Sequence, residues 1–313
     1  MQTRTLGKNG PKVSVVGLGC NNFGTLDLER SRAVVHRALD AGITLFDTAD
    51  VYGNRGGSEE QLGEILGSKR KDIVLATKFA MPMDDSGAKS GGSRGYILEA
   101  VEASLKRLKT DWIDLYQMHQ PDPNTPIEET LGALNDLVKQ GKVRHIGCSN
   151  MPGWQVADSQ WVSKTNGFAA FETAQDEYSL LVRDIEKNLA PALEHYGMGL
   201  LPYFPLASGL LTGKYKRDAP IPENTRFARM GRFGERYMTE QNWKIIGELE
   251  TFATERGHSL LDLAFSWLIA HPYLSSVIAG ATRPEQIDAN VKAAGWEMTP
   301  EDVKAVGKIA RKT

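Results

Sequence analysis

The chain has 313 residues, of which 41% are hydrophobic and 24% charged, and its formal net charge is −2. A chain of this length can bury a large core. Because α/β barrels reach about 250 residues or more as one unit, we expect a single domain over residues 1–313. The small net charge provides no field that would recruit nucleic acid or an anionic membrane.

The cysteines and the apolar segments indicate a cellular location. Cys20 and Cys148 are too few for a disulfide framework, and no Cys-x-x-Cys motif is present, which is typical of a reducing compartment. Residues 1–10 lack the apolar core of a signal peptide. The most apolar helical stretch, 260–270, is far shorter than the roughly 20 residues that span a bilayer. We therefore expect a cytoplasmic protein.

Short apolar strands alternate with amphipathic helices along almost the whole chain. This alternation predicts a parallel sheet with helical crossovers. Helices are expected near residues 29–41, 99–108 and 127–140, and Gly42 follows the first of them as a natural C-cap. Eight strand–helix units favour an α/β fold closed into a (β/α)8 TIM barrel. The candidate strands cover residues 15–19, 43–46, 73–77, 113–119, 143–147, 169–173, 199–203 and 276–279.

An N-terminal hairpin precedes the barrel in this interpretation. The segments 3–6 and 13–16 flank Asn9-Gly10, the dipeptide most typical of a tight two-residue turn. We therefore expect these two segments to form a β-hairpin.

Two long loops, 80–95 and 206–240, are expected at the C-terminal face of the barrel. Loops of this length in a compact domain are usually functional. Glycines lower the free energy needed to change backbone angles, so we expect the loop 206–240 to be mobile without cofactor and to close over the bound cofactor, with new protection from hydrogen exchange within residues 209–234. In the same loop, the best candidates for lining a substrate pocket are Phe227, Met230, Phe233 and Tyr237.

Four ionisable side chains follow three consecutive strands. Asp47 and Tyr52 come just after residues 43–46, Lys78 follows the next strand, and His119 ends the one after it. In an α/β barrel the carboxyl ends of all strands open onto one face, and that face carries the chemistry. We therefore expect these four side chains to lie together there.

This group of side chains is suited to proton transfer. A phenol is a weak acid with a pKa near 10, and a nearby ammonium group stabilises the phenolate. Lys78 can supply that charge to Tyr52, Asp47 can hold Lys78 in place, and His119 can hydrogen-bond to a substrate oxygen. Protonation of a developing alkoxide suits the reduction of a carbonyl group. Because no side chain delivers a hydride, a reduced nicotinamide is required.

Each residue taken singly has a simpler interpretation. A lone Asp at a strand end is often a helix cap, a lone Tyr a loop aromatic, a lone Lys a solvated charge and a lone His a structural hydrogen-bond partner. Their arrival at three successive strand ends favours the functional interpretation. The six histidines form no zinc-binding pattern, so we expect no metal.

The segment Phe46-Asp47-Thr48-Ala49-Asp50-Val51-Tyr52-Gly53, followed by Ser58-Glu59-Glu60, resembles the signature of aldo-keto reductases. The resemblance covers nearly the whole chain and continues through Thr77-Lys78 and residues 111–119, 141–150, 175–180, 203–215 and 278–290. It implies that Asp47, Tyr52, Lys78 and His119 form the catalytic tetrad. Tyr52 is then the general acid in reduction and the base in oxidation. It also implies that the hairpin closes the bottom of the barrel.

The same resemblance implies a cofactor site formed after the last four strands. Ser149, Asn150 and Gln175 would hold the nicotinamide carboxamide, and Tyr203 would stack on its ring. The loop over the pyrophosphate would use Leu206, Ser208, Leu211 and Lys214. The adenosine end would use Gly280, Thr282, Arg283, Gln286 and Asn290.

Arg283 indicates which nicotinamide cofactor binds. It precedes Pro284 at an expected helix start, where backbone N–H groups and a guanidinium both favour an anion. This favours NADPH/NADP+ over NADH. The simpler interpretation is that Thr282 caps the helix and Arg283 is solvated.

Three functions remain open at this point. The first is NADPH-dependent reduction of a small-molecule aldehyde or ketone. The second is a cofactor-sensing binding subunit resembling the potassium-channel β-subunits, which share the fold. The third is a barrel enzyme of another class, such as an isomerase that uses Lys78 or His119 without nicotinamide.

Overall fold

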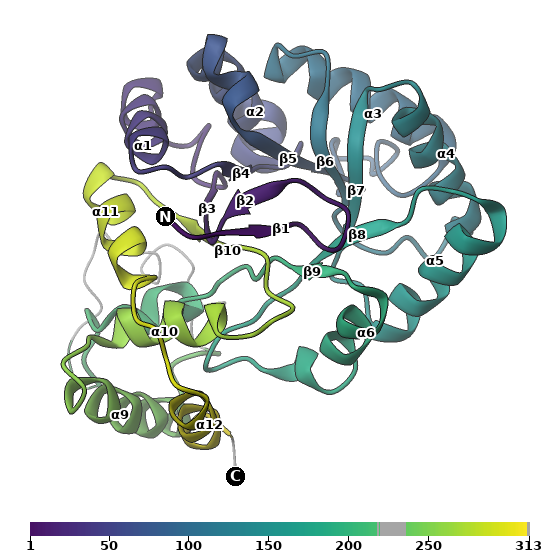
Figure 1. The fold of residues 1–313 in the computed structure, drawn as a ribbon. Coiled ribbons are helices and arrows are strands. Elements are labelled where there is room, and N and C mark those ends of the chain that lie inside the picture. Colours follow the sequence, from purple (N-terminus) through teal and green to yellow (C-terminus); the bar gives the residue numbers. More distant parts are fainter. Residues whose placement is uncertain (218, 220–235, 312–313) are drawn as a thin grey trace.

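The computed structural model describes residues 1–217, 219 and 236–311. In these residues eight parallel strands form one sheet in the order β10-β3-β4-β5-β6-β7-β8-β9, curled around a central axis (Figure 1). Hydrogen bonds join its two ends, because Leu200 N donates to Tyr273 O at 2.7 Å and Ile278 N to Pro202 O at 3.3 Å. The expected (β/α)8 TIM barrel is confirmed. The strands are β3 (Val16–Gly19), β4 (Leu45–Asp47), β5 (Val74–Phe79), β6 (Ile113–Met118), β7 (Val143–Ser149), β8 (Phe171–Gln175), β9 (Gly199–Leu200) and β10 (Val277–Gly280).

Helices surround the sheet on its outer side (Figure 1). They are α1 (Leu28–Asp40), α2 (Tyr52–Leu66), α3 (Arg94–Leu108), α4 (Ile127–Lys139), α5 (Gly153–Asn166), α6 (Leu189–Tyr196), α9 (Glu240–Thr254), α10 (Leu260–Ile269), α11 (Pro284–Ala293) and α12 (Pro300–Ile309). Short 3-10 helices are η1 (Gly67–Asp72), η2 (Asp184–Glu186) and η3 (Ala207–Thr212). None of the described helices is both long enough and apolar enough to cross a bilayer.

Several element boundaries differ from those expected by a few residues, and three of these differences have a local reason. Helix α3 begins five residues earlier, at Arg94, because Ser93 caps it by accepting from Tyr96 N. Strand β8 begins at Phe171 because Ala169 N donates to the Asn135 side chain instead of to a neighbouring strand. Strand β9 ends at Leu200, and Pro202 has no N–H with which to extend the ladder.

The barrel interior has two levels. At the lower level a small apolar cluster contains Leu45, Ala76, Leu115, Leu201 and Ile278, together with Leu6 and Val13 from the N-terminal hairpin. Because successive side chains of a strand point to opposite faces, the residue two positions later returns to the interior. Each of three adjacent strands therefore places an apolar and then a polar residue there: Leu45 and Asp47, Ala76 and Lys78, Leu115 and Gln117.

The hairpin of β1 (Thr3–Thr5) and β2 (Lys12–Ser14) lies at the bottom of the barrel. Its antiparallel pairing runs from Thr3–Ser14 to Thr5–Lys12, so the connection extends from Leu6 to Pro11. The expected hairpin is confirmed, and its connection contains Asn9-Gly10. The positive φ in this connection lies at Gly7, where a Cβ would be 2.3 Å from Glu172 O. The connection lets Leu6 turn inward and close the barrel.

The segment after β4 places Tyr52 through an unusual backbone. Gly53, Asn54, Arg55 and Gly56 have φ values of 67°, 60°, 64° and 124°, a region that L-residues rarely occupy. A Cβ at Gly53 would lie 2.5 Å from Phe23 O, so glycine is required there. The chain therefore makes a left-handed turn immediately after Tyr52.

Buried polar contacts hold this segment from behind. Ser58 Oγ donates to Cys20 O and contacts Thr48 Oγ1, both at 2.8 Å. Glu59 accepts from Thr77 Oγ1 at 2.5 Å and from Arg107 Nε at 2.7 Å.

Asp50 stands apart from these contacts. It is 1% exposed, and neither carboxylate oxygen has a hydrogen-bond partner among the described residues. Burial, and then the charge of Glu59, raises its pKa to about 8. The Asp50 carboxyl group is therefore protonated and uncharged at neutral pH.

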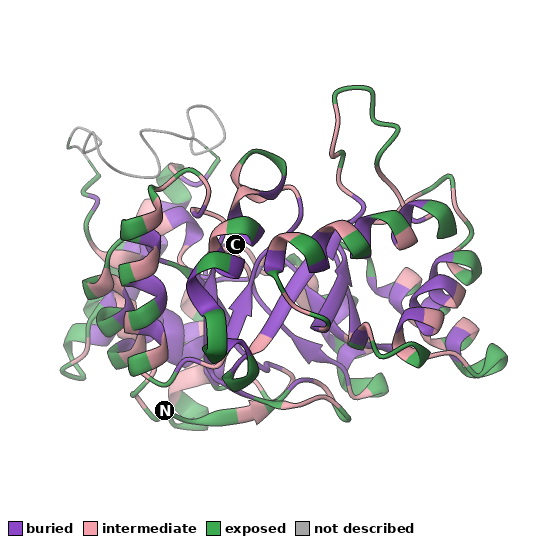
Figure 2. Ribbon diagram, turned by 90° about the horizontal axis from the view of Figure 1, so that it is seen from above, coloured by how far each residue is buried: buried purple, intermediate pink, exposed green. Residues whose placement is uncertain are grey.

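In Figure 2 an exposed segment projects from the barrel on the side away from the N-terminus. Residues 220–235, and with them Phe227, Met230 and Phe233, lie outside the described residues. The expectation that the loop 206–240 closes over a cofactor, with new protection within residues 209–234, falls mostly on residues outside the described part of the chain. Tyr237 is described, and it is buried.

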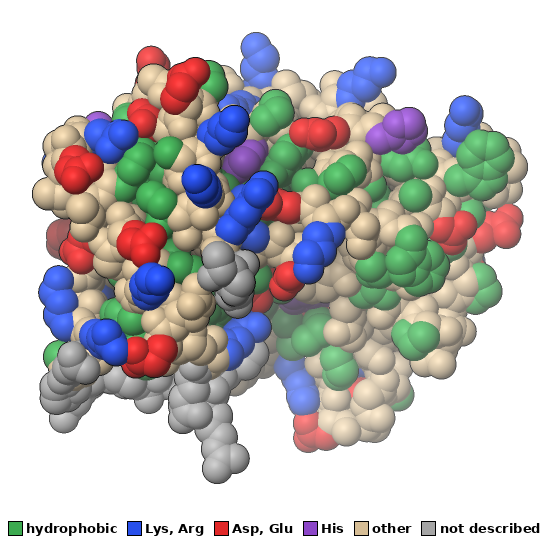
Figure 3. Space-filling view, turned by 90° about the horizontal axis from the view of Figure 1, so that it is seen from below, with side chains coloured by type: hydrophobic (Ala, Val, Ile, Leu, Met, Phe, Trp, Pro, Cys, Tyr) green, Lys and Arg blue, Asp and Glu red, His purple; other side chains and the backbone are tan. Residues whose placement is uncertain are grey.

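On the face shown in Figure 3, acidic and basic side chains are interspersed. Hydrophobic side chains also gather on the right of this view. Trp154 and Trp161 of α5 are 67% and 63% exposed. No single sign of charge dominates this face.

Removing the hairpin's apolar contact should destabilise the whole barrel. Leu6 is fully buried among barrel residues, so Leu6→Ala should lower the free energy of unfolding by about 2–5 kcal/mol, measured by urea denaturation. Leu28→Ala, at the half-buried start of α1, is the control and should have a smaller effect. A Leu6→Ala effect below about 1 kcal/mol would show that the hairpin is not packed into the barrel.

Asp50 should make stability depend on pH. An unfolded Asp titrates near pH 4, whereas folded Asp50 titrates at about 8. Between these values the folded chain binds more protons, so stability falls as pH rises. Asp50→Asn cannot ionise, so its stability relative to the natural chain should increase from pH 5 to 8. The exposed Asp158→Asn is the control, and an Asp50→Asn difference that does not change with pH would contradict the assignment.

Candidate active site

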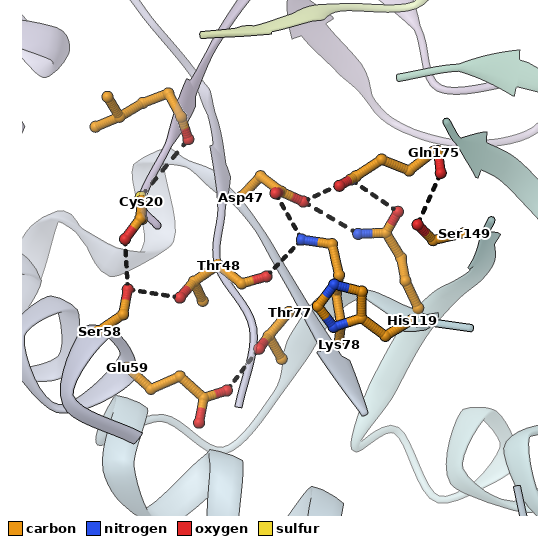
Figure 4. Close-up of polar contacts among 12 residues, drawn as sticks. Cys20, Asp47, Thr48, Ser58, Glu59, Thr77, Lys78, His119, Ser149 and Gln175 are labelled. Atoms are coloured by element: carbon orange, nitrogen blue, oxygen red, sulfur yellow. Dashed lines mark hydrogen bonds and ion pairs between the residues drawn. The ribbon is translucent and has the colours of Figure 1, made fainter. Parts of the chain in front are cut away.

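A buried ion pair lies at the upper level of the barrel. Lys78 Nζ donates to Asp47 Oδ2 at 2.6 Å and to Thr48 O at 2.8 Å, and Lys78 and Asp47 are 0% and 3% exposed. Burial opposes the charge of Lys78, but Asp47 and then Tyr52 outweigh it and hold the Lys78 pKa above its ordinary value. Lys78 therefore remains an ammonium ion inside the barrel. Figure 4 shows its contacts with Asp47 and Thr48.

Tyr52 and His119 lie beside this ammonium ion. Lys78 Nζ is 5.1 Å from the centre of the Tyr52 ring, and the Tyr52 and His119 rings meet edge to face with centroids 5.7 Å apart. A hydrogen bond with Tyr52 also contributes to the raised Lys78 pKa. The structure thus brings together all four side chains expected at the strand ends.

His119 is held as the neutral imidazole. Burial, followed by the nearby Lys78 charge, lowers the His119 pKa to about 3. Its backbone N–H donates to Phe79 O at 2.9 Å. A neutral imidazole has one N–H, which can donate to a ligand oxygen.

Gln117 is a site residue that the sequence analysis missed. Its Nε2 donates to Asp47 Oδ1 at 3.1 Å, and Gln175 Nε2 donates to the same oxygen at 2.8 Å. Gln175 Nε2 also lies 3.3 Å from Gln117 Oε1 (Figure 4). The available signal was that Gln117 precedes His119 by two residues and so shares its side of the strand, whereas its register with Lys78 comes from the structure.

The expected nicotinamide-binding residues form a second connected group. Ser149 Oγ donates to Gln175 O at 2.7 Å, and Asn150 Nδ2 donates to Ser149 Oγ at 3.1 Å and to His119 O at 3.0 Å. Tyr203 OH donates to Asn150 Oδ1 at 2.8 Å. These contacts join the ends of β7, β8 and β9 to the tetrad.

A cavity of about 760 Å³ lies above the tetrad. This volume suits a cofactor-sized ligand. Two expected residues do not line it: Lys78 lies behind Asp47, and Leu211 is fully buried in the hydrophobic core. The expected residues that do line it are Asp47, Tyr52, His119, Ser149, Asn150, Gln175, Tyr203, Leu206, Ser208, Lys214, Gly280, Thr282, Arg283, Gln286 and Asn290.

The cavity also has residues that were not assigned to the cofactor. Asn21 and Asn22 follow β3 and reach within 3.2 Å of where a Cβ on Gly280 would lie. They could have been found by the same strand-end rule. Cys20, Phe204 and Thr212 also line the cavity.

The far end of the cavity is suited to anions. Arg283 is the N-cap of α11 and Pro284 its first residue, as expected. Thr282 N donates to Gln286 Oε1 at 2.7 Å. Ser208 Oγ is buried without a hydrogen-bond partner among the described residues, and Lys214 lies nearby at Gly209. An unpaired hydroxyl with exposed cations fits a phosphate-bearing cofactor.

No group of three or more His, Cys, Asp or Glu side chains within the described part of the chain is arranged to hold a metal ion. The side chains that face the cavity offer a phenol, an imidazole, amides and cations. These groups can donate protons or hydrogen bonds to an organic cofactor and its substrate.

The sequence matches the model of the Aldo/keto reductase family over residues 15–311. The chain is 37% identical over 94% of its length to a probable voltage-gated potassium channel subunit beta of Arabidopsis thaliana, covering 91% of that protein. It is 36% identical over 94% of its length to L-glyceraldehyde 3-phosphate reductase of Escherichia coli strain K12, covering 87% of it. It is 33% identical over 97% of its length to versiconal hemiacetal acetate reductase of Aspergillus parasiticus, covering 95% of it.

The family match spans nearly the whole chain and agrees with the barrel and with the reductases among the relatives. The chain therefore belongs to the aldo/keto reductase family and is an oxidoreductase that acts on carbonyl groups.

Proposed function

We propose that this protein reduces aldehydes or ketones to alcohols, reversibly, with NADPH as the hydride donor and Tyr52 as the proton donor. The observation that carries the proposal is the buried Lys78–Asp47 pair beside Tyr52 and His119 at the wall of the large cavity. Members of the family generally use NAD(P)H.

Tyr52 is the proton donor in this proposal. The Lys78 ammonium stabilises the phenolate that remains after proton transfer, and Asp47 keeps Lys78 in position. The two glutamine amides on Asp47 Oδ1 leave Oδ2 directed at Lys78. Proton transfer from a positioned phenol to the developing alkoxide then completes the reduction.

His119 orients the carbonyl group. Its pKa of about 3 keeps the imidazole neutral at physiological pH, so it donates a hydrogen bond without adding a second cation beside Lys78. Such a donor stabilises negative charge as it develops on the carbonyl oxygen. A bound reduced nicotinamide supplies the hydride, which no side chain can do.

The proposed cofactor site runs from the tetrad toward α11. Ser149, Asn150 and Gln175 would hold the carboxamide, with Gln175 using Oε1 because its Nε2 contacts Asp47. Tyr203 would stack on the nicotinamide. Leu206, Ser208 and Lys214 would border the pyrophosphate, with Leu211 supporting that loop from the core. The adenosine end would contact Gly280, Thr282, Arg283, Gln286 and Asn290.

A cofactor-sensing subunit is the second candidate. It is favoured by the relatives in Arabidopsis thaliana and Oryza sativa that are named probable voltage-gated potassium channel subunits beta. The tetrad does not separate the two functions, since a sensing subunit can also bind NADPH. Steady-state turnover of an aldehyde panel separates them, because the sensor should give little or none.

Replacing the proton donor should abolish turnover but not cofactor binding. Tyr52→Phe should lower kcat by roughly 10²-fold or more, the usual contribution of a general acid. The NADPH affinity, followed by tryptophan fluorescence, should remain. Tyr196→Phe on exposed α6 is the matched control. Near-normal turnover in Tyr52→Phe would remove Tyr52 from this role.

Arg283 should discriminate between the two nicotinamide cofactors. If its guanidinium pairs with the 2′-phosphate, Arg283→Ala should weaken NADPH binding by about 1.5–3 kcal/mol, as for a hydrogen bond to a charged group. NADH binding should hardly change. Lys292→Ala, an exposed cation on the same helix, is the control for general charge. Equal losses for NADPH and NADH would place Arg283 at a shared part of the cofactor.

A further inference from the structure

An ion pair joins two loops at the active-site end of the barrel, and neither proton transfer nor cofactor binding uses it. Arg55 Nη2 donates to Asp85 Oδ1 at 2.5 Å. Arg55 follows Tyr52 by three residues, and Asp85 belongs to the loop after β5, the strand that carries Lys78. The pair therefore connects the loops that leave two adjacent strand ends of the tetrad.

The backbone holds Arg55 close to Tyr52 at a strained position. Arg55 has a φ of 64° between Asn54 at 60° and Gly56 at 124°, and its N–H donates to Val51 O at 3.2 Å. This hydrogen bond closes a single tight turn that contains both Tyr52 and Arg55. Non-glycine residues in this region persist where the surroundings enforce them, and such positions cluster at functional sites. The left-handed turn thus places Arg55 three residues after the proposed proton donor, with its guanidinium paired to the loop that follows β5.

Asp85 is held loosely by comparison. The Asp85 side chain is 94% exposed and that of Arg55 41% exposed. An ion pair between solvent-exposed side chains contributes little to stability. A carboxylate or phosphate on a bound molecule could replace Asp85 at the guanidinium, which binds either group through two parallel hydrogen bonds.

We propose that Arg55 is the substrate's anion subsite, which selects carbonyl compounds carrying a carboxylate or phosphate group, and that Asp85 occupies this subsite until the substrate displaces it. This inference rests on the proposed carbonyl reduction at Tyr52. It assigns opposite roles to the two partners of one ion pair, because Arg55 attracts the substrate and Asp85 competes with it.

Steady-state kinetics with matched substrates tests the proposal. The measured quantity is the ratio of kcat/KM for the anionic over the neutral substrate, using succinate semialdehyde against butanal and glyceraldehyde 3-phosphate against glyceraldehyde. Arg55→Met should lower this ratio by roughly 10- to 100-fold. Asp85→Asn should raise it by about two- to fivefold, the strength of an exposed ion pair. The two substrate pairs show whether the subsite takes carboxylate or phosphate.

Lys89→Met provides the matched control. Lys89 lies in the same loop as Asp85 and forms an exposed ion pair with Glu99. This variant should leave the ratio unchanged. If the Arg55–Asp85 pair is purely structural, Arg55→Met and Asp85→Asn should change the kcat/KM ratio in the same direction or not at all. Either result would overturn the proposal.

A binding measurement keeps this test separate from the proposed function. Calorimetry with succinate, which cannot be reduced, reports on the subsite in the NADP+-loaded protein whether or not any aldehyde is turned over. Succinate binding should be lost in Arg55→Met and strengthened in Asp85→Asn. Absence of succinate binding to the natural chain, or equal binding to all three proteins, would refute the anion subsite. Absence of aldehyde turnover alone would refute only the proposed function.

Discussion

The ion pair between Lys78 and Asp47 is the constraint on which the rest of the site depends. Both side chains are almost completely buried, and a buried charge is tolerated only when it is paired and its remaining hydrogen-bonding capacity is satisfied. Asp47 meets this condition with Lys78 on one oxygen and two glutamine amides on the other. Lys78 meets it with Asp47 and Thr48 O. The ammonium ion can therefore stay charged next to Tyr52.

This polar level needs the apolar level beneath it. Leu6 and Val13 of the hairpin complete the cluster inside the lower barrel, so the N-terminal segment closes the end of the barrel opposite the cavity. Burial of the pair thus depends on a segment that is distant in sequence from Lys78. One end of the barrel provides stability and the other provides chemistry, as is typical of this architecture.

The carboxyl end of the barrel is itself divided. The strands β4, β5 and β6 deliver the tetrad, and the loops after them carry the Arg55–Asp85 pair. The ends of β7 to β10 supply most of the remaining cavity lining, which extends to α11. A cofactor lying along the second half would have its reactive end at the tetrad. In the proposed function the substrate would lie along the first half, so the charges of the loops on that side would bear on substrate selection.

The sequence by itself determined the barrel and the gathering of Asp47, Tyr52, Lys78 and His119 at one face. These depend on local rules: strands alternating with helices, and polar residues at strand ends that must share one face. Most of the cavity lining was expected from the resemblance to aldo-keto reductases. The start of α11 at Pro284 followed from proline's fixed φ and missing N–H.

Only the tertiary structure decided the features that join distant residues. Gln117 meets Asp47 across 70 positions and Gln175 meets it across 128, and no local pattern specifies such pairs. Asn9-Gly10 indicated the hairpin, whereas the inward turn of Leu6 depends on packing against residues inside the barrel. Core packing likewise drew Leu211 away from the cavity. Local preferences amount to roughly 1 kcal/mol or less per residue, whereas burying one large apolar side chain contributes about 1.5–3 kcal/mol, so packing prevails where the two disagree.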